Sequence, residues 1–253
     1  MMDNTSSKSA SKQTIYRRAG LLLFSLGILL GILLFGSAVW ADLEAFLFDS
    51  ALKARTSLTT LSCPVMISSK ETGMISANIR NPNDRETKRI VRVHITEGYT
   101  SLIREINTDL LIEANSSSKV EWEIYPDDAV YNDRLIMFRA YLFPNYPIPD
   151  ADGSCGVLLV QSDTFTGRQI LIFTITVSLV LIGAGRWLWQ LGVRPISQTR
   201  IRNIASSMNW LGGIVIAGIV LSLLEYWGPS GLALIVSLLL IGVIFGRYVP
   251  SDT

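Results

Sequence analysis

The sequence predicts an α+β membrane protein, in which four transmembrane helices carry an exported antiparallel β-sandwich between the first helix and the second. Three observations lead to this prediction. The 253-residue chain is 49% hydrophobic and only 17% charged, whereas a typical soluble domain carries about 25% charged residues. Four long apolar stretches each suffice to cross about 30 Å of hydrocarbon. Between the first two stretches, apolar and polar residues alternate with the period of two that is typical of β-strands.

The four apolar stretches predict the spans directly. The first contains no charged residue, and the last two are separated by the turn signal Gly228-Pro229-Ser230-Gly231, which predicts a tight helical hairpin. The predicted spans are residues 19–41, 169–190, 207–226 and 230–247.

Basic residues in the short flanks predict the orientation. The N-terminal segment 1–18 and the loop 191–206 carry an excess of Lys and Arg, and Arg247 stands against Asp252 at the tail 248–253, so we expect all three to be cytoplasmic. Residues 42–168 carry 13 Lys or Arg against 18 Asp or Glu, which fits the exported side. The predicted location is a cell membrane with both termini in the cytoplasm. A bacterial cytoplasmic membrane is favoured, and a eukaryotic endomembrane remains an alternative.

The first span also has features of a signal sequence. A basic segment precedes it, and Val39-Trp40-Ala41 before Asp42 forms a passable cleavage pattern. The apolar run is long for a signal peptide, which favours an uncleaved helix. The domain that follows is exported in either case.

Two further sets of residues belong to the predicted helices. Tryptophans at the span ends are predicted interface anchors, because one end of the indole ring is apolar and the other is polar; they are Trp40, Trp187, Trp189, Trp210 and Trp227. Small residues spaced four apart let helix backbones approach closely, within this chain or against another subunit; they are Gly27, Gly31, Gly213, Ala217, Gly242 and Gly246.

Residues 61–163 are predicted to form the exported sandwich. Turn signals separate about seven short strands, the number and spacing of an antiparallel sandwich. The strands are expected at 63–68, 73–80, 91–95, 102–112, 119–125, 134–143 and 155–161. This pattern resembles immunoglobulin-like and fibronectin-like exported domains in fold, without any family motif. Residues 42–60 are expected to form a juxtamembrane helix or a plain linker.

The only two cysteines lie near the ends of this domain. Cys63 opens the first predicted strand and Cys155 opens the last. In an oxidising compartment such a pair is expected to form a disulfide, which would stabilise the domain by roughly 4–5 kcal/mol on the chain-entropy model. A redox function would favour a close pair such as C-x-x-C, which the sequence lacks.

Few residues point to chemistry. The single histidine, His94, is expected to be a solvent-exposed strand residue. No P-loop, dinucleotide fingerprint or G-x-S-x-G motif occurs, and the acidic residues at 127–133 and 150–152 are better explained as turns than as a calcium site. We therefore expect no enzymatic activity, no cofactor and no metal. The net charge of +1 gives no reason to expect binding to nucleic acid.

The expected function is a non-enzymatic membrane component. Its partners would be the lipid bilayer and a protein bound through the exported domain or the glycine-rich helices, as in an accessory or scaffolding subunit of an envelope complex. Two alternatives remain: an extracytoplasmic ligand sensor that signals through a partner, and a small permease component.

Overall fold

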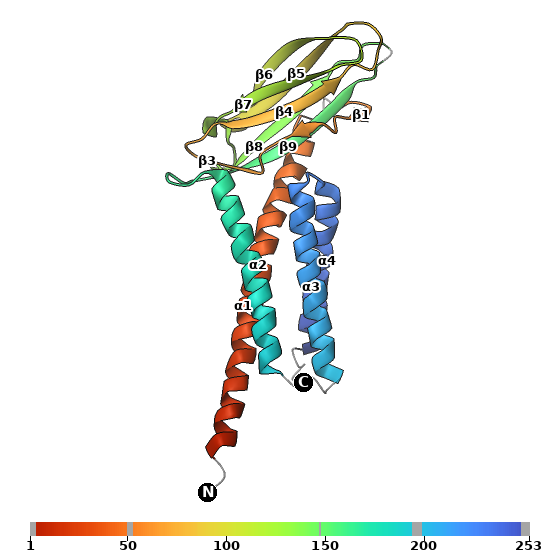
Figure 1. Ribbon diagram of the computed structural model, residues 1–253. Coiled ribbons are helices and arrows are strands. Elements are labelled where there is room, and N and C mark those ends of the chain that lie inside the picture. Colours follow the sequence, from red (N-terminus) through yellow and green to blue (C-terminus); the bar gives the residue numbers. More distant parts are fainter. Residues whose placement is uncertain (1–3, 50–52, 147, 194–198, 249–253) are drawn as a thin grey trace. The chain divides into compact units, whose positions relative to one another are not determined.

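The structure is a computed structural model that describes residues 4–49, 53–146, 148–193 and 199–248, with side chains at 13–49, 53–146, 148–193 and 202–244. It comprises four long helices and two β-sheets (Figure 1). The chain divides into two compact units. The helical unit consists of Met1–Gly36 and Ile172–Thr253, and the sandwich unit consists of Ser37–Leu171.

The predicted spans 19–41, 169–190 and 230–247 each lie inside one helix, whereas 207–226 extends three residues past the end of its helix at Leu223. The helices are α1 (Asn4–Leu47), α2 (Gly167–Gly192), α3 (Thr199–Leu223) and α4 (Trp227–Tyr248). All four are long and apolar enough to cross a membrane, with mean hydropathies of 2.5, 1.9, 1.8 and 2.1 in chain order. The basic segment expected at 1–18 is helical from Asn4, and the expected loop 191–206 is helical again from Thr199. Residues 194–198 and 249–253 lie outside the described part.

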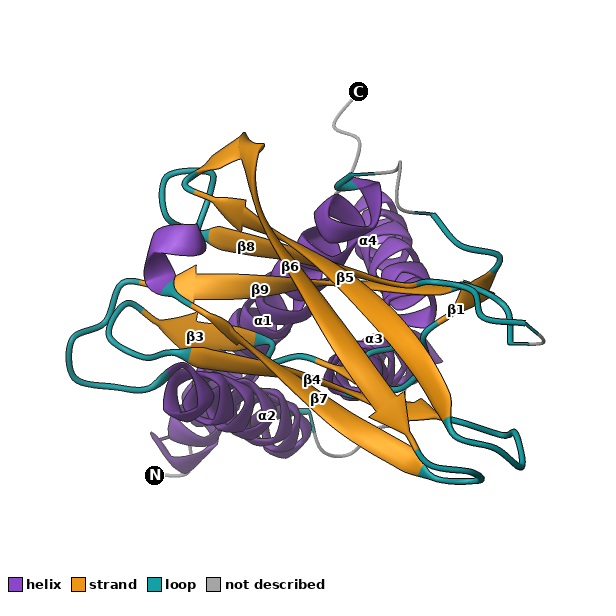
Figure 2. Cartoon of the chain, turned by 90° about the horizontal axis from the view of Figure 1, so that it is seen from above, coloured by secondary structure: helices purple, strands orange, loops and turns teal. Residues whose placement is uncertain are grey.

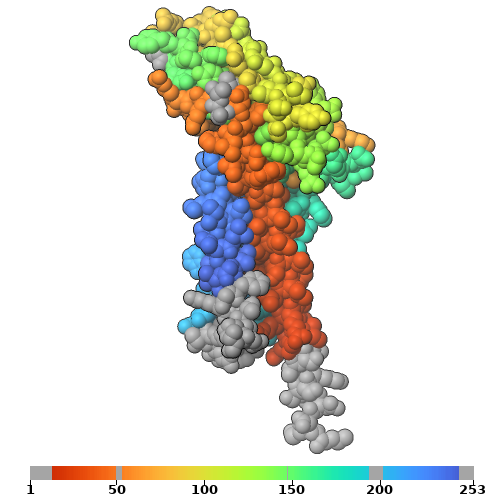
Figure 3. Space-filling model, turned by 180° about the vertical axis from the view of Figure 1, so that it is seen from behind, coloured from red at the N-terminus to blue at the C-terminus, as the bar shows by residue number. Residues whose placement is uncertain are grey.

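Close backbone contact joins α1 to α2 in the helical unit. A Cβ at Gly27 would lie 2.7 Å from the Ile182 nitrogen, and one at Gly185 would lie 2.3 Å from the Phe24 nitrogen. The Ser178 hydroxyl donates to the Gly27 carbonyl at 2.9 Å, which satisfies a buried polar group. A space-filling view shows α4 alongside α1 (Figure 3). A Cβ at Gly36 of α1 would lie 3.5 Å from the Leu234 side chain of α4.

The turn between α3 and α4 lies earlier than the sequence signal predicts. Helix α4 already begins at Trp227, so the Gly228-Pro229 pair occupies its first turn. Proline is compatible with a first helical turn because the missing N–H would have no partner there. The chain reverses at Leu224–Tyr226 instead, where Glu225 has a positive φ of 62°.

The strands form two sheets (Figure 2). The larger sheet has the order β1-β9-β8-β5-β6, with β3 also paired to β9, and the smaller has the order β2-β4-β7. The strands are β1 (Thr56–Ser57), β2 (Leu61–Ser62), β3 (Met66–Ser68), β4 (Gly73–Arg80), β5 (Thr87–Glu97), β6 (Tyr99–Ile112), β7 (Ser117–Ile124), β8 (Leu135–Leu142) and β9 (Ala151–Val160). A short 3-10 helix, η1 (Pro126–Asp128), precedes β8.

The larger sheet is mixed, so the prediction of a purely antiparallel sandwich is wrong in this respect. Strands β1 and β3 each pair parallel to β9, and the other strand pairs are antiparallel. The period of two reports which face of a sheet a side chain lies on, but it says nothing about the direction of the neighbouring strand. All seven predicted strands are present, and β1 and β2 were missed because each has only two residues.

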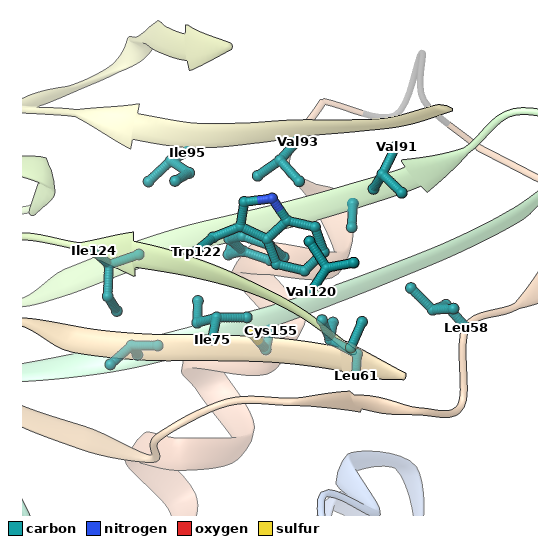
Figure 4. Close-up of a cluster of buried hydrophobic side chains, with 14 of the residues drawn as sticks. Leu58, Leu61, Ile75, Val91, Val93, Ile95, Val120, Trp122, Ile124 and Cys155 are labelled. Atoms are coloured by element: carbon teal, nitrogen blue, oxygen red, sulfur yellow. The ribbon is translucent and has the colours of Figure 1, made fainter. Parts of the chain in front are cut away.

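The main core lies between the two sheets (Figure 4). From the larger sheet it takes Val91, Val93 and Ile95, all fully buried, and the smaller sheet adds Trp122 and Ile75. Trp122 packs against Phe138 with ring centroids 5.6 Å apart.

Residues 42–60 are neither one helix nor a plain linker. Helix α1 runs without a break to Leu47, whereas Thr56–Ser57 and Leu61–Ser62 form the first two strands. The near-helical spacing of apolar residues in 42–52 therefore predicts only the first part of this segment correctly.

Candidate functional site

The outer face of the larger sheet, turned away from the main core, receives the last turns of α1. We call the residues that contact this helix the helix seat: Val130, Leu135, Met137, Arg139, Gly156 and Leu158. The seat explains why β8 is apolar on both faces. Its residues of one parity face Trp122 and the main core, and those of the other parity face α1.

The apolar part of the seat brings the helix backbone against the sheet. Ala41 and Ala45 are fully buried, and Phe48 is nearly so. A Cβ at Gly156 would lie 2.1 Å from the Ala41 carbonyl oxygen, so no other residue fits at this position without moving the helix. The Gly156 amide also donates to Asp42 Oδ1 at 3.1 Å. Small residues on both elements are thus required for this close approach.

Arg139 ends the helix from the sheet side. Its Nη1 donates to the carbonyl oxygens of Phe46 (3.1 Å) and Phe48 (2.8 Å), and its Nη2 pairs with Asp152 Oδ2 at 2.6 Å. The last carbonyls of a helix lack partners within the helix, and a cation there also interacts favourably with the helix dipole. Arg139 therefore acts as a C-terminal cap contributed by a strand 91 residues further along the chain.

Register places a row of polar residues beside this cap. His94 of β5 lies directly between Glu105 of β6 and Arg139 of β8. Its Nδ1 lies 2.5 Å from Asp49 Oδ2, just after the end of α1, and its Nε2 lies 3.4 Å from Glu105 Oε2. The His94 side chain is only 12% exposed. The prediction of a solvent-exposed histidine is therefore wrong, because the end of α1 lies against this part of the sheet.

Glu105 is held as a carboxylate on the solvent side of this row. Asn107 donates to it at 2.7 Å, and this hydrogen bond is the main cause that lowers the pKa of Glu105, with Arg92 and His94 adding to the effect. Arg92 itself lies 3.2 Å from Glu105. The row thus carries a carboxylate on β6, a histidine on β5 and an arginine on β8.

The start of α2 is joined to the same sheet. Glu71 Oε1 accepts hydrogen bonds from the amides of Ser68 and Gly167, each at 3.0 Å. A Cβ at Gly167 would lie 2.4 Å from the Met66 carbonyl oxygen, so β3 and the first residue of α2 are also in close backbone contact.

The predicted disulfide between Cys63 and Cys155 is present, with the two Cα atoms 6.5 Å apart. It links the segment before β3 to the middle of β9, and Cys155 forms part of the main core. The strands that receive α1 and α2 are therefore covalently joined. This arrangement holds both helix ends on one sheet.

The remaining predicted residues fall into two groups. Trp187 and Trp210 are 60% and 68% exposed, whereas Trp189 is 3% exposed and packs inside the helical unit. Trp40 and Trp227 are exposed by 40% and 38%, and the Trp40 ring lies 5.7 Å from Tyr131.

The predicted small-residue contacts also divide. Gly27 and Gly31 lie against neighbouring helices, and a Cβ at Gly31 would lie 2.7 Å from Val215. A Cβ at Gly213 or Gly242 would meet no described atom within 4 Å, and Ala217 is exposed, so these three do not pack against the described helices. The surroundings of Gly246 lie outside the described side chains.

The polar residues of the seat bind the end of α1. No group of three or more His, Cys, Asp or Glu among the described residues could hold a metal ion. Asp128, from the acidic cluster noted in the sequence, pairs with Arg104 at 2.5 Å and accepts from the Tyr125 amide at 2.7 Å. This carboxylate therefore stabilises the turn before β8.

Comparison with known proteins gives only distant similarities. No protein-family model and no curated protein matches the chain. The CARDB domain of the PF1109 protein from Pyrococcus furiosus is 12% identical over 40% of this chain and 90% of its own, with a TM-score of 0.31. A cycloisomaltooligosaccharide glucanotransferase from Paenibacillus sp. is 12% identical over 44% of this chain and 15% of its own (TM-score 0.32). Red sea bream transglutaminase is 15% identical over 41% and 17% (TM-score 0.30). At these TM-scores the similarities say nothing about function.

Proposed function

We propose that this chain is a multi-pass protein of a bacterial cytoplasmic membrane, with both termini in the cytoplasm and the sandwich exported. Four helices of sufficient length and hydropathy support this proposal. So does the charge distribution, because residues 42–168 carry more acidic than basic residues while the short flanks are basic. The disulfide fits an oxidising compartment.

Within that setting, the sandwich is a partner-binding module of an accessory or scaffolding subunit. The observation that carries this proposal is the helix seat, where Arg139, Gly156 and the disulfide hold the domain on its own helix ends. The contacts of the seat occupy one face of the larger sheet, and the other surfaces of the sandwich are left for recognition.

Strand β6 is the surface best suited to a protein partner. Among the described strands it pairs only with β5, so one edge of a 14-residue strand remains open. Open strand edges bind further strands through main-chain hydrogen bonds. Large apolar side chains lie along β6, with Tyr99 70%, Leu102 51% and Leu111 68% exposed. Its charges are partly neutralised by β5, as in the pair Lys88–Asp109 at 2.9 Å.

A ligand sensor is the second candidate, favoured by one observation. Arg139 and His94 join the sheet directly to the last turn of α1 and to Asp49 just beyond it. A ligand that shifts β5 or β8 would therefore act on the end of a membrane-spanning helix. Sensing predicts saturable binding of a small molecule to the purified full chain, which the accessory function does not require.

Site-specific crosslinking in native membranes tests the accessory function. A photoreactive amino acid at Leu111 on β6 is compared with the same group at Met74, an exposed residue of β4 in the smaller sheet. We expect a reproducible, stoichiometric adduct from Leu111 and a much weaker one from Met74. Equal labelling at both positions, or only self-adducts, would count against partner binding through β6.

A further inference from the structure

We infer that Arg186 in α2 binds the phosphate of an anionic phospholipid at the end of the helical unit. This inference rests on the proposed membrane insertion. Arg186 lies six residues before the last residue of α2, about 9 Å along the helix axis. In the proposed orientation this places the guanidinium near the cytoplasmic headgroups, where phosphate groups are concentrated.

Neutral groups hold the guanidinium in place. Its Nε donates to Asn209 Oδ1 of α3 at 2.8 Å. With the Gln190 amide turned so that its oxygen faces the arginine, that oxygen accepts from Nη1 and Nη2 at 3.0 Å. The guanidinium also lies 5.3 Å from the ring of Trp189, a buried residue of the same helix. Because a guanidinium has five N–H groups, these contacts leave two for a ligand.

The charge of Arg186 has no acidic counterpart nearby. Among the described side chains of the helical unit the only acid is Glu225, at the turn after α3. That turn is more than 14 residues along α3 from Asn209, which corresponds to at least about 20 Å. A cation held by neutral groups in a partly apolar setting is stabilised when an anion binds to it, because a desolvated charge without a counter-charge is unfavourable.

Further arginines share this end of the unit. A Cβ at Gly192 would lie 2.6 Å from the Arg17 nitrogen and 2.7 Å from the Gln13 carbonyl oxygen, which places this part of α1 beside the end of α2. Arg17, Arg18 and Arg202 are all exposed, and Arg202 precedes Asn209 by two helical turns. Arginine binds phosphate through paired N–H groups, and basic sites between cytoplasmic helix ends attract anionic headgroups.

A membrane lipid fits this site better than a free phosphate ion. The exposed rings of Trp187 and Trp210 flank Arg186 and Asn209 in sequence on their two helices. Exposed indole rings are typical of the membrane interface. A ligand at this place would therefore offer acyl chains to apolar side chains as well as a phosphate to Arg186.

Native mass spectrometry of the detergent-purified full chain tests the inference. The probe is phosphatidylglycerol, compared with phosphatidylcholine of the same acyl chains and with inorganic phosphate. We expect preferential retention of phosphatidylglycerol, with apparent affinity reduced about tenfold in Arg186→Gln, in line with the loss of charge-assisted hydrogen bonds. Arg168→Gln is the matched control, because Arg168 is an exposed arginine at the opposite end of the same helix; it should change the affinity less than twofold.

Three results would overturn the inference: equal retention of both lipids, equal loss in both variants, or inorganic phosphate competing as well as phosphatidylglycerol. If Arg186→Gln does not fold, Arg186→Lys keeps the charge but loses the paired N–H geometry, and binding between the two extremes is expected. Failure of the chain to insert into liposomes would instead reject the proposed membrane location, so the two failures are distinguishable.

Discussion

Two arginines are buried in the larger sheet, and they differ in the partners that surround their charge. Arg139 is 1% exposed and has a carboxylate and two helix carbonyls as partners. Arg89 is 2% exposed, yet it makes one hydrogen bond, from Nη2 to the Pro149 carbonyl at 3.3 Å. Its Nε and Nη1 have no partner among the described residues. Burial lowers the pKa of Arg89, since desolvation disfavours the charged form.

Arg139 therefore stabilises the fold through its charge, whereas the burial of the Arg89 charge costs free energy. Arg139 faces outward from the main core, toward the end of α1, where its charge meets orphan carbonyls and Asp152. Arg89 shares the inward parity of Val91 and Val93, so its guanidinium is directed into the sandwich. Removing one member of a buried pair costs about 3–5 kcal/mol, whereas replacing an unfavourable buried charge by an apolar residue is often neutral or stabilising. The two sites should therefore respond to the same substitution with opposite sign.

The largest effect is expected for Arg139→Met. This change leaves the half-buried Asp152 without its arginine and removes the hydrogen bonds to the Phe46 and Phe48 carbonyls, and the free energy of opening of β8 and of residues 37–48 should fall by about 3–5 kcal/mol. Hydrogen exchange of the full chain, followed by mass spectrometry, measures this loss segment by segment. Arg134→Met is the control, since Arg134 is exposed next to β8, and it should change stability by less than about 0.5 kcal/mol.

Asp152→Asn completes a double-mutant cycle with Arg139→Met. The single change makes Arg139 resemble Arg89 by removing its counter-charge, while the hydrogen bonds to α1 remain. We expect a coupling energy of about 1–3 kcal/mol between the two changes. Additive effects would show that the pair does not hold the helix end.

The second prediction concerns Arg89→Met. Methionine fills much of the space of the arginine stem and carries no charge. The free energy of unfolding should therefore rise by about 1–2 kcal/mol, which is within the range for such replacements. Exchange protection of β5 measures the gain, with Arg85→Met on the exposed loop before β5 as the control. A fall in stability of more than about 1 kcal/mol would instead match the removal of a charge that has a partner. That result would contradict this view and show that Arg89 has an anionic partner.

Sequence patterns predicted the elements well and the contacts between them poorly. The four apolar stretches and seven of the nine strands follow from hydropathy and period, and the disulfide follows from the presence of only two cysteines. The helix seat was missed because it depends on residues far apart in the chain, such as Phe48 and Arg139. One signal was present in the sequence. Arg139 is a charge inside the apolar run 135–142, and such a charge requires a specific partner.

The same limit applies to His94 and to the parallel strands. Alternation along β5 places His94 on the face opposite Val93, which suggests solvent if nothing covers that face. The covering element is the end of α1, and residues 42–60 gave no sign of where that end would lie. The partners of a face are a tertiary property, so local periodicity cannot supply them.

The smallest effect is expected from pH, through the partly buried ion pair of Arg104 and Asp128. In Arg104–Asp128 the carboxylate is the more buried member, with 6% of its side chain exposed against 27% for the arginine. Burial is the main cause that raises the pKa of Asp128, although the Tyr125 amide and Arg104 oppose it. A carboxyl group with a raised folded-state pKa contributes most at low pH, and this contribution is lost as pH rises through that pKa.

Wild type should therefore gain stability relative to Asp128→Asn as the pH is lowered from neutral through the range where carboxyl groups titrate. Asparagine cannot titrate and keeps a similar shape, so the difference between the two proteins isolates this group. Exchange protection of β8, next to η1, is the measurement, with both proteins followed at the same series of pH values. The opposite slope would mean that Arg104 outweighs burial and that this pair resembles Arg139–Asp152, a charge pair stabilised in its ionised form.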